Sequence, residues 1–87
     1  PQMAQPVYQL GRIAADAGQH LEALRHYERA RGLAGAAQLP IDHRVGVAYM
    51  DLGEKDKARQ FLQRVVQDRR ASRNSVDDAR KRLAQLG

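Results

Sequence analysis

Few side chains in this 87-residue sequence could perform catalysis. Ser72 and Ser75 follow an arginine-rich stretch. Their hydroxyl groups are expected to form hydrogen bonds with nearby backbone groups, which accounts for serine at these positions without a catalytic role. Asp77 and Asp78 are adjacent on an expected helix, so their carboxylates diverge and suit its first turn rather than acid–base catalysis. Cysteine is absent, which removes thiol nucleophiles and thiolate ligands. We therefore predict that the protein is not an enzyme.

The histidines do not form a metal-binding pattern. His20 and His26 are six residues apart, which places them on different sides of a helix, and His43 lies far away in the sequence. The glycine-containing segment 32–35 lacks the lysine and serine that follow a phosphate-binding loop. We expect no metal, nucleotide or other cofactor.

The chain is basic, with a net charge of +5, and twelve of its residues are arginines. Clusters at residues 64–73 and 80–82 leave nucleic acid open as an alternative partner of the C-terminal half. Acidic residues interleave with these arginines and no aromatic residue alternates with them for base stacking, so a solvated helix surface is the favoured interpretation. No apolar run approaches the roughly 20 residues that span a membrane. The lack of cysteine leaves the compartment undecided between cytoplasm and bacterial periplasm.

One pattern occurs twice, at an offset of 35 residues. Residues 11–23 read GRIAADAGQHLEA, and residues 46–58 read GVAYMDLGEKDKA. Both copies hold glycine at the first and eighth positions and alanine at the thirteenth. Apolar residues with helical spacing surround each copy and predict two helical hairpins, with helices near residues 6–17, 21–31, 41–52 and 56–66. Pro6 suits a first helical turn, and Asp56 is expected to cap the fourth helix.

The last segment predicts a fifth helix over residues 75–86. Ser75 is the expected N-cap, and Val76, Ala79, Leu83 and Leu86 share one face. A third complete copy would place glycine at position 81, where the chain has lysine. We therefore interpret this segment as a terminal capping helix.

These hairpins resemble the tetratricopeptide repeat, a helix-turn-helix unit of 34 residues. The matching positions are Leu10, Gly11, Gly18, Ala23, Tyr27 and Ala30 in the first copy and Val45, Gly46, Tyr49, Gly53, Ala58, Leu62 and Val65 in the second. The resemblance implies an all-α, right-handed solenoid of about five helices. We expect one module over residues 1–87, with repeats at 4–37 and 38–71 and a cap at 75–86. Because the sequence starts with proline, we also expect it to be a fragment of a longer protein.

The glycines have two expected roles. A glycine inside a helix costs about 1 kcal/mol relative to alanine, so a close helix crossing must offset the cost at Gly11 and Gly46. We predict that Gly11 lies opposite Ala23 and Gly46 opposite Ala58. Gly18 is expected to end its helix in the left-handed conformation, as is Gly53.

The resemblance also implies a function, because the first helix of each tetratricopeptide hairpin lines a concave groove that holds a peptide or partner helix. The matching positions here are Tyr8, Arg12, Ala15, His43, Arg44, Val47 and Met50. An aromatic ring, arginines and a flexible methionine suit a peptide with acidic character. We expect a protein-interaction scaffold, with similarity to arginine-rich repeats of bacterial assemblies. Two repeats are few for a stable stack, which predicts further repeats or self-association through the first helix.

Overall fold

The computed structural model describes residues 3–87, and its regular elements in that range are helical apart from one isolated backbone bridge. The elements, in chain order, are α1 (Ala4–Asp16), α2 (His20–Arg31), the 3₁₀ helix η1 (Ala36–Gln38), α3 (Ile41–Asp51), α4 (Lys55–Gln67) and α5 (Arg73–Leu86). The prediction of an all-α fold with five main helices is confirmed.

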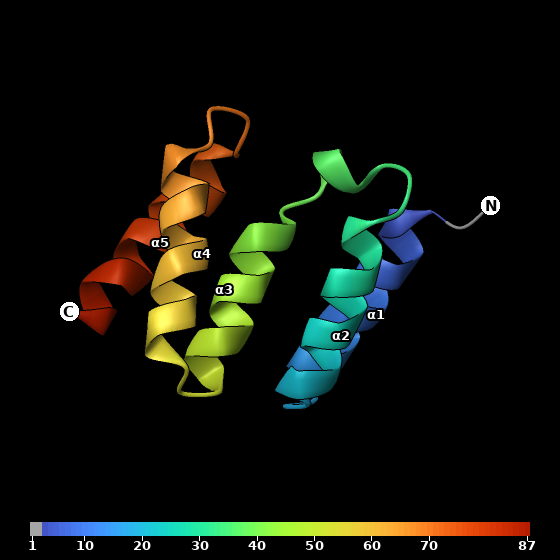
Figure 1. Cartoon of the computed structure of the whole chain (residues 1–87), viewed down its shortest axis with the longest axis horizontal. Helices are drawn as coiled ribbons and strands as arrows, with labels where there is room; N and C mark the ends of the chain where they lie inside the picture. The colour runs from blue at the N-terminus through green and yellow to red at the C-terminus, as the bar shows by residue number, and fades with distance from the viewer. Residues whose placement is uncertain (1–2) are drawn as a thin grey trace.

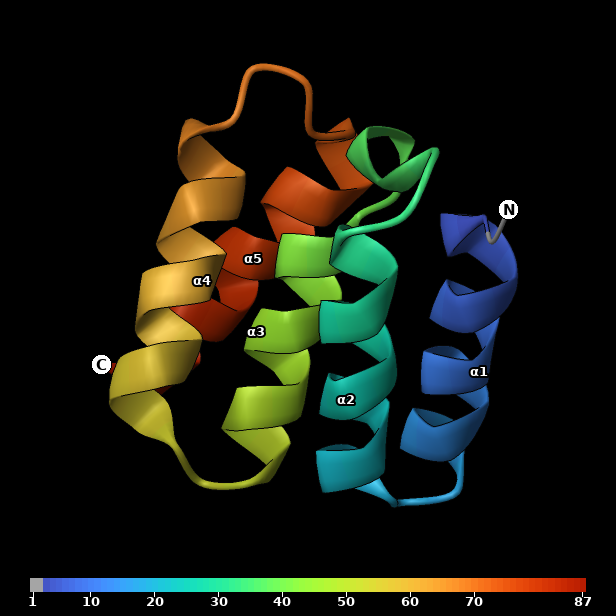
Figure 2. The same cartoon turned by 45° about the vertical axis from the view of Figure 1, so that its right-hand side comes forward.

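The helices form a row in which each packs against its neighbours in the sequence, with α1 and α5 at opposite ends (Figure 1). Side chains also connect alternate helices. Arg44 of α3 hydrogen-bonds Tyr8 of α1, and the Arg31 guanidinium of α2 lies 5.8 Å from the ring centre of Phe61 on α4. The row therefore has two layers, one made by the odd helices α1, α3 and α5 and the other by α2 and α4. Figure 2 shows the two hairpins, α1–α2 and α3–α4, closed by short turns at the same end of the molecule.

Those two turns have the same backbone geometry. Gly18 has φ of +78° and Gly53 has φ of +79°, a left-handed conformation that side chains disfavour. After each glycine the next amide donates back into the preceding helix, from Gln19 to Ala14 and from Glu54 to Tyr49. This confirms the predicted helix stops.

Two predicted N-cap residues, Asp56 and Ser75, are not the N-caps in the structure. The N-cap of α5 is Ser72, whose Oγ accepts a hydrogen bond from the Ser75 amide at 3.1 Å. Ser75 therefore lies inside the first turn, where its side chain is buried. The N-cap of α4 is Glu54, and Asp56 makes no capping hydrogen bond. Its carboxylate instead lies 3.2 Å from Arg59 Nη1, one turn further along the helix.

The repeated glycines provide space for large side chains of the neighbouring helix. A Cβ atom built on Gly11 would lie 2.6 Å from Tyr27 Cδ1, and one on Gly46 would lie 2.9 Å from Leu62 Cγ. Tyr27 and Leu62 are almost fully buried and occupy equivalent positions in the two hairpins. The prediction of a close approach is therefore confirmed, and the atoms nearest to the two glycines belong to Tyr27 and Leu62, four residues beyond the predicted partners Ala23 and Ala58. The helices can cross closely because glycine has no Cβ atom, and a large side chain of the neighbouring helix fills the space beside it.

The core has two parts. The larger includes the buried residues of α1 and α2 together with Ile41, Val45 and Ala48 of α3. The smaller joins Leu62 and Val65 of α4 to Ala79 of α5. Thus α5 covers the outer side of α4 through its apolar face, as the sequence predicted for a capping helix.

We predict that Gly11→Ala and Gly46→Ala each destabilise the fold by about 1–3 kcal/mol, although alanine favours helix. Neither neighbouring side chain can move freely, because both are enclosed in the core. Urea unfolding followed by circular dichroism measures the change.

The matched control is Gly32→Ala. Its backbone φ is −88°, and an added Cβ would meet no atom nearer than 4.0 Å. This variant should stay within about 0.5 kcal/mol of the parent. Equal stability of all three variants would contradict the packing role of Gly11 and Gly46.

Candidate functional site

The seven predicted binding residues lie on α1 and α3, in the odd-helix layer. Arg12 is exposed, whereas Ala15, His43, Arg44, Val47 and Met50 are half-buried. Ala15 packs against the larger core. The structure thus brings all seven residues to one layer, where they differ in their exposure to solvent.

Tyr8 does not present its ring to solvent, which corrects the sequence-based expectation of an aromatic surface there. Its side chain is 3% exposed, and its ring centre lies 5.7 Å from that of Tyr27. The Tyr8 hydroxyl accepts a hydrogen bond from Arg44 Nε at 3.2 Å. Tyr8 therefore acts from the core, by holding the Arg44 guanidinium between α1 and α3.

A second set of contacts connects α3 to α5. His43 Nε2 donates to Asp78 Oδ2 at 2.6 Å, and Arg82 Nε donates to the same oxygen at 2.7 Å. Arg82 Nη1 also lies 3.8 Å from the sulfur of Met50. One carboxylate thus orients a histidine and an arginine, and the arginine in turn contacts the methionine.

The sequence analysis missed Asp78 and Arg82 as members of this site. The signal was the repeat offset itself, because adding 35 residues to His43 gives Asp78. The same step leads from Tyr8 to His43 and from Val47 to Arg82. Treating the last helix only as a cap hid this continuation, whereas its position in the layer is that of a third first-helix.

We call the surface along these three helices the odd-helix face. Its members are Arg12, His43, Arg44, Val47, Met50, Asp78 and Arg82. Three arginines and one aspartate leave it positively charged, and the methionine and valine add apolar area. Such a surface favours an acidic ligand with some apolar side chains.

Asp78 is held in its charged form. Burial raises the pKa of Asp78, but hydrogen bonds from His43 and Arg82 lower it by more, so that the pKa lies below the ordinary value of 3.8. The carboxylate therefore stays ionised at neutral pH and holds His43 and Arg82 in place.

A cavity of about 540 Å³ opens beside this face, where the segment before α3 meets the connection between α4 and α5. Its lining combines apolar Leu39 and Val65 with polar Arg31, His43 and Arg70. His43 is the only odd-helix-face residue that lines it. The predicted groove residues and this cavity are therefore neighbouring but separate features.

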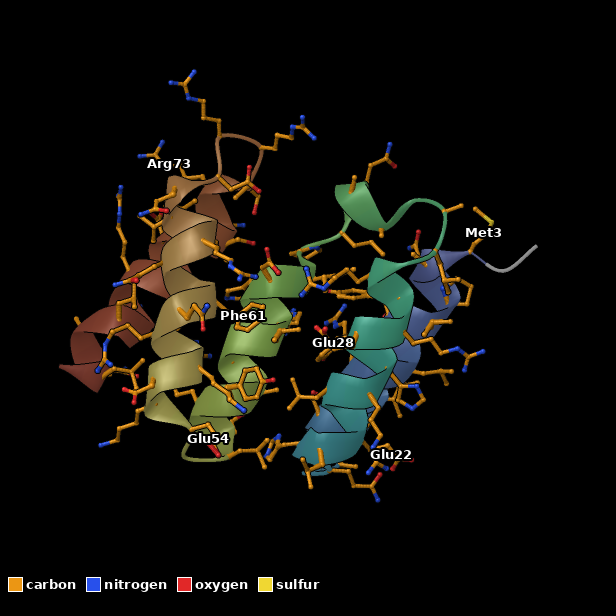
Figure 3. All side chains as sticks on the ribbon, in the orientation of Figure 1. Met3, Glu22, Glu28, Glu54, Phe61 and Arg73 are labelled. Carbon is orange, nitrogen blue, oxygen red and sulfur yellow. The ribbon has the colours of Figure 1, made fainter. Side chains whose placement is uncertain are left out.

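Several arginines of the even-helix layer make contacts with other residues of the chain. The Arg64 guanidinium lies 4.5 Å from the ring centre of Phe61, and Arg31 Nη1 lies 2.7 Å from Asp42 Oδ1. Figure 3 shows Phe61 on the side of α4 that is directed toward α3. Arg59 pairs with Asp56 and donates to the backbone oxygen of Leu86. Of these three arginines, Arg64 belongs to the basic clusters that the sequence left available for nucleic acid.

Within residues 3–87, no three histidine, aspartate or glutamate side chains are grouped so that they could hold a metal ion. Over the same residues, none of the helices combines the length and apolar character needed to cross a membrane.

Comparison with known protein families gives a match in the second hairpin. A family model described as "Tetratricopeptide repeat" matches residues 43–72, which contain most of α3, all of α4 and the connection that follows. Neither the curated proteins nor the solved structures include a match. The family resemblance is confirmed for the second hairpin, and the first hairpin repeats its glycine turn and its buried glycine contact. This match supports a protein–protein interaction module.

We predict that Asp78→Asn lowers the free energy of unfolding by about 1 kcal/mol at pH 7, a modest value because Asp78 is partly exposed. The folded-state pKa of Asp78 is below its unfolded value, so the stabilisation is present above pH 3.8 and is lost as the pH falls through the folded-state pKa. Urea unfolding at pH 7 and pH 3 should show the difference between parent and variant shrinking in acid.

Asp77→Asn is the control, because this exposed neighbour carries the same charge on the same helix turn. It should change stability at pH 7 by less than about 0.5 kcal/mol. If the Asp78→Asn difference stays constant between pH 7 and pH 3, the ionised carboxylate is not what orients His43 and Arg82.

Proposed function

From the tetratricopeptide repeat in residues 43–72, we propose that the protein is a scaffold whose odd-helix face binds an acidic peptide or partner helix. The observation that carries this proposal is two sets of contacts that together join three alternate helices. Tyr8 of α1 fixes Arg44 of α3, and Asp78 of α5 fixes His43 of α3 and Arg82. Side chains that are oriented before binding lose less conformational entropy when a ligand arrives.

The chemistry of the face supports an acidic ligand. The guanidinium groups of Arg44 and Arg82 are half-buried, and Arg12 adds an exposed positive charge at one end. Arginine binds carboxylates through paired hydrogen bonds that a lysine ammonium cannot reproduce. Met50 and Val47 supply an apolar surface between the charged groups, and methionine adapts to differently shaped side chains.

A peptide-display selection against the protein tests this function. Selected sequences should be enriched in aspartate and glutamate. Their affinity should fall at least about tenfold for the double variant Arg12→Glu plus Arg44→Glu, because both charges face the proposed ligand. Fluorescence anisotropy with a selected peptide measures the dissociation constants.

The matched control is Arg25→Glu plus Arg80→Glu, which changes the net charge equally at two exposed positions outside the odd-helix face. Binding to this control should change by less than about threefold. Equal losses in both double variants would show general charge attraction, and selected peptides that bind both equally well would place the site elsewhere. Either result contradicts the proposal.

Because the C-terminal half is basic, nucleic-acid binding is the alternative function. Fluorescence anisotropy with labelled nucleic acids tests it. Generic RNA and duplex DNA should show no binding at about 150 mM salt under this proposal. Binding that weakens steeply with salt and depends on Arg69, Arg70 and Arg73 would support the nucleic-acid alternative instead.

A further inference from the structure

Exposed apolar side chains follow one side of α1. Leu10 is 47% and Ile13 is 65% exposed, and Pro6 and Ala17 are exposed beside them. The intervals of four, three and four residues place all four on one face that continues past the end of α1. We call this set the α1 stripe. An end helix whose outer face is directed only to water normally carries polar residues there.

The repeat offset shows what covers this position in the second hairpin. Adding 35 residues to Pro6, Leu10 and Ile13 gives Ile41, Val45 and Ala48 of α3. These three are 4%, 0% and 3% exposed, and they belong to the core part that includes α1 and α2. In the second hairpin, therefore, the equivalent face is covered by α2.

A contact between a histidine and a carboxylate marks the end of that covered face. His20, the first residue of α2, has Nδ1 3.7 Å from Asp51 Oδ2 at the end of α3. The equivalent of Asp51 in the first hairpin is Asp16, the last residue of α1, and it is exposed. The first hairpin thus repeats both the apolar stripe and the acidic residue at its end, without a helix against them among the described residues.

We infer that the α1 stripe is a docking site for an amphipathic helix that packs on α1 as α2 packs on α3. The partner helix carries a basic residue in its first turn, beside Asp16. Apolar residues follow the basic residue at steps of four and then three, as Leu24 and Tyr27 follow His20 in α2. Because Leu10 and Ile13 are larger than Val45 and Ala48, the partner's apolar side chains are small to medium in size.

A second copy of this chain fits the α1 stripe less well. The opposite end of the row is α5, whose exposed residues include Arg73, Arg80 and Lys81. Stacking α5 of one copy on α1 of another would bury these charges against apolar side chains, which is costly. The inference also goes beyond the proposed function, because the α1 stripe and the odd-helix face are different surfaces.

Two synthetic helical peptides test the inference with the full chain. Both copy residues 18–33 with His20→Arg, so that the basic group is charged at pH 7.5, and both carry a hydrocarbon staple joining positions 21 and 25, which are exposed in α2. The second peptide also carries Leu24→Ala, to suit the larger side chains of α1. Circular dichroism first establishes that both are helical, and fluorescence anisotropy then measures binding.

At least one peptide should bind with a dissociation constant on the order of 100 µM, since a single helix face is a small interface. Ile13→Glu in the chain should weaken this binding at least about tenfold. Leu21→Glu is the matched control, because Leu21 is 62% exposed but lies on α2, outside the α1 stripe. The control should bind as the parent does.

A charge exchange tests the orientation of the partner. Asp16→Lys should weaken binding of the arginine-bearing peptide about threefold and should favour a peptide with glutamate at that position by a similar factor. Sedimentation velocity of the chain alone, over a range of concentrations, shows whether it pairs with itself.

Three results would overturn the inference. One is that neither helical peptide binds, and another is that Ile13→Glu and Leu21→Glu weaken binding equally. The third is a dimer of the chain that Ile13→Glu dissociates, which would make a second copy the occupant. The variants of Arg12 and Arg44 that test the odd-helix face report on the proposed function independently.

Discussion

The fold depends on a steric constraint at two equivalent places, where a large buried side chain of one helix occupies the space beside a glycine of the other. Tyr27 fills this space at Gly11, and Leu62 fills it at Gly46. Removing one Cβ allows the backbone of α1 or α3 to approach its partner, and the inserted side chain recovers the packing contacts that the glycine cannot make. The helix propensity lost at glycine is thereby offset by close packing in the core.

This constraint also positions the surfaces. Because the Tyr27 ring enters beside Gly11, Tyr8 packs against it and directs its hydroxyl to Arg44. The equivalent packing in the second hairpin sets α3 between α2 and α4, with α5 packed on α4, and His43 reaches Asp78. The geometry of the core therefore determines the odd-helix face. Its side chains are held both by contacts with core residues and by contacts with one another.

Much of the fold could be predicted from the sequence, because its signals are local. Apolar spacing indicated the five helices, and the positions of Gly18 and Gly53 indicated where two of them end. The 35-residue offset gave the order of packing. The first residues of the helices were harder to predict. Ser72 and Ser75 are both suitable N-caps, and only the path of the connection before α5 makes Ser72 the N-cap.

The candidate site was harder to predict because it depends on contacts distant in the sequence. Nothing local distinguishes the buried Tyr8 from an exposed aromatic residue, and nothing local shows that Asp78 meets His43. The sequence predicted an uncovered surface on the first helix, but it did not show which apolar residues of that helix form it. Leu10 and Ile13 have the helical spacing typical of core residues. Their equivalents in α3 are buried against α2, and only this comparison shows that α1 lacks a covering helix among the described residues.

A double-mutant cycle between Gly46→Ala and Leu62→Ala tests the central constraint most directly. Urea unfolding of the four proteins, in a fixed concentration of trimethylamine N-oxide that keeps the least stable one folded, gives the coupling between the two positions. The account predicts that Gly46→Ala destabilises the parent but is neutral or stabilising once Leu62 is truncated, with a coupling of about 1–3 kcal/mol. An equal cost of Gly46→Ala in both backgrounds would contradict it.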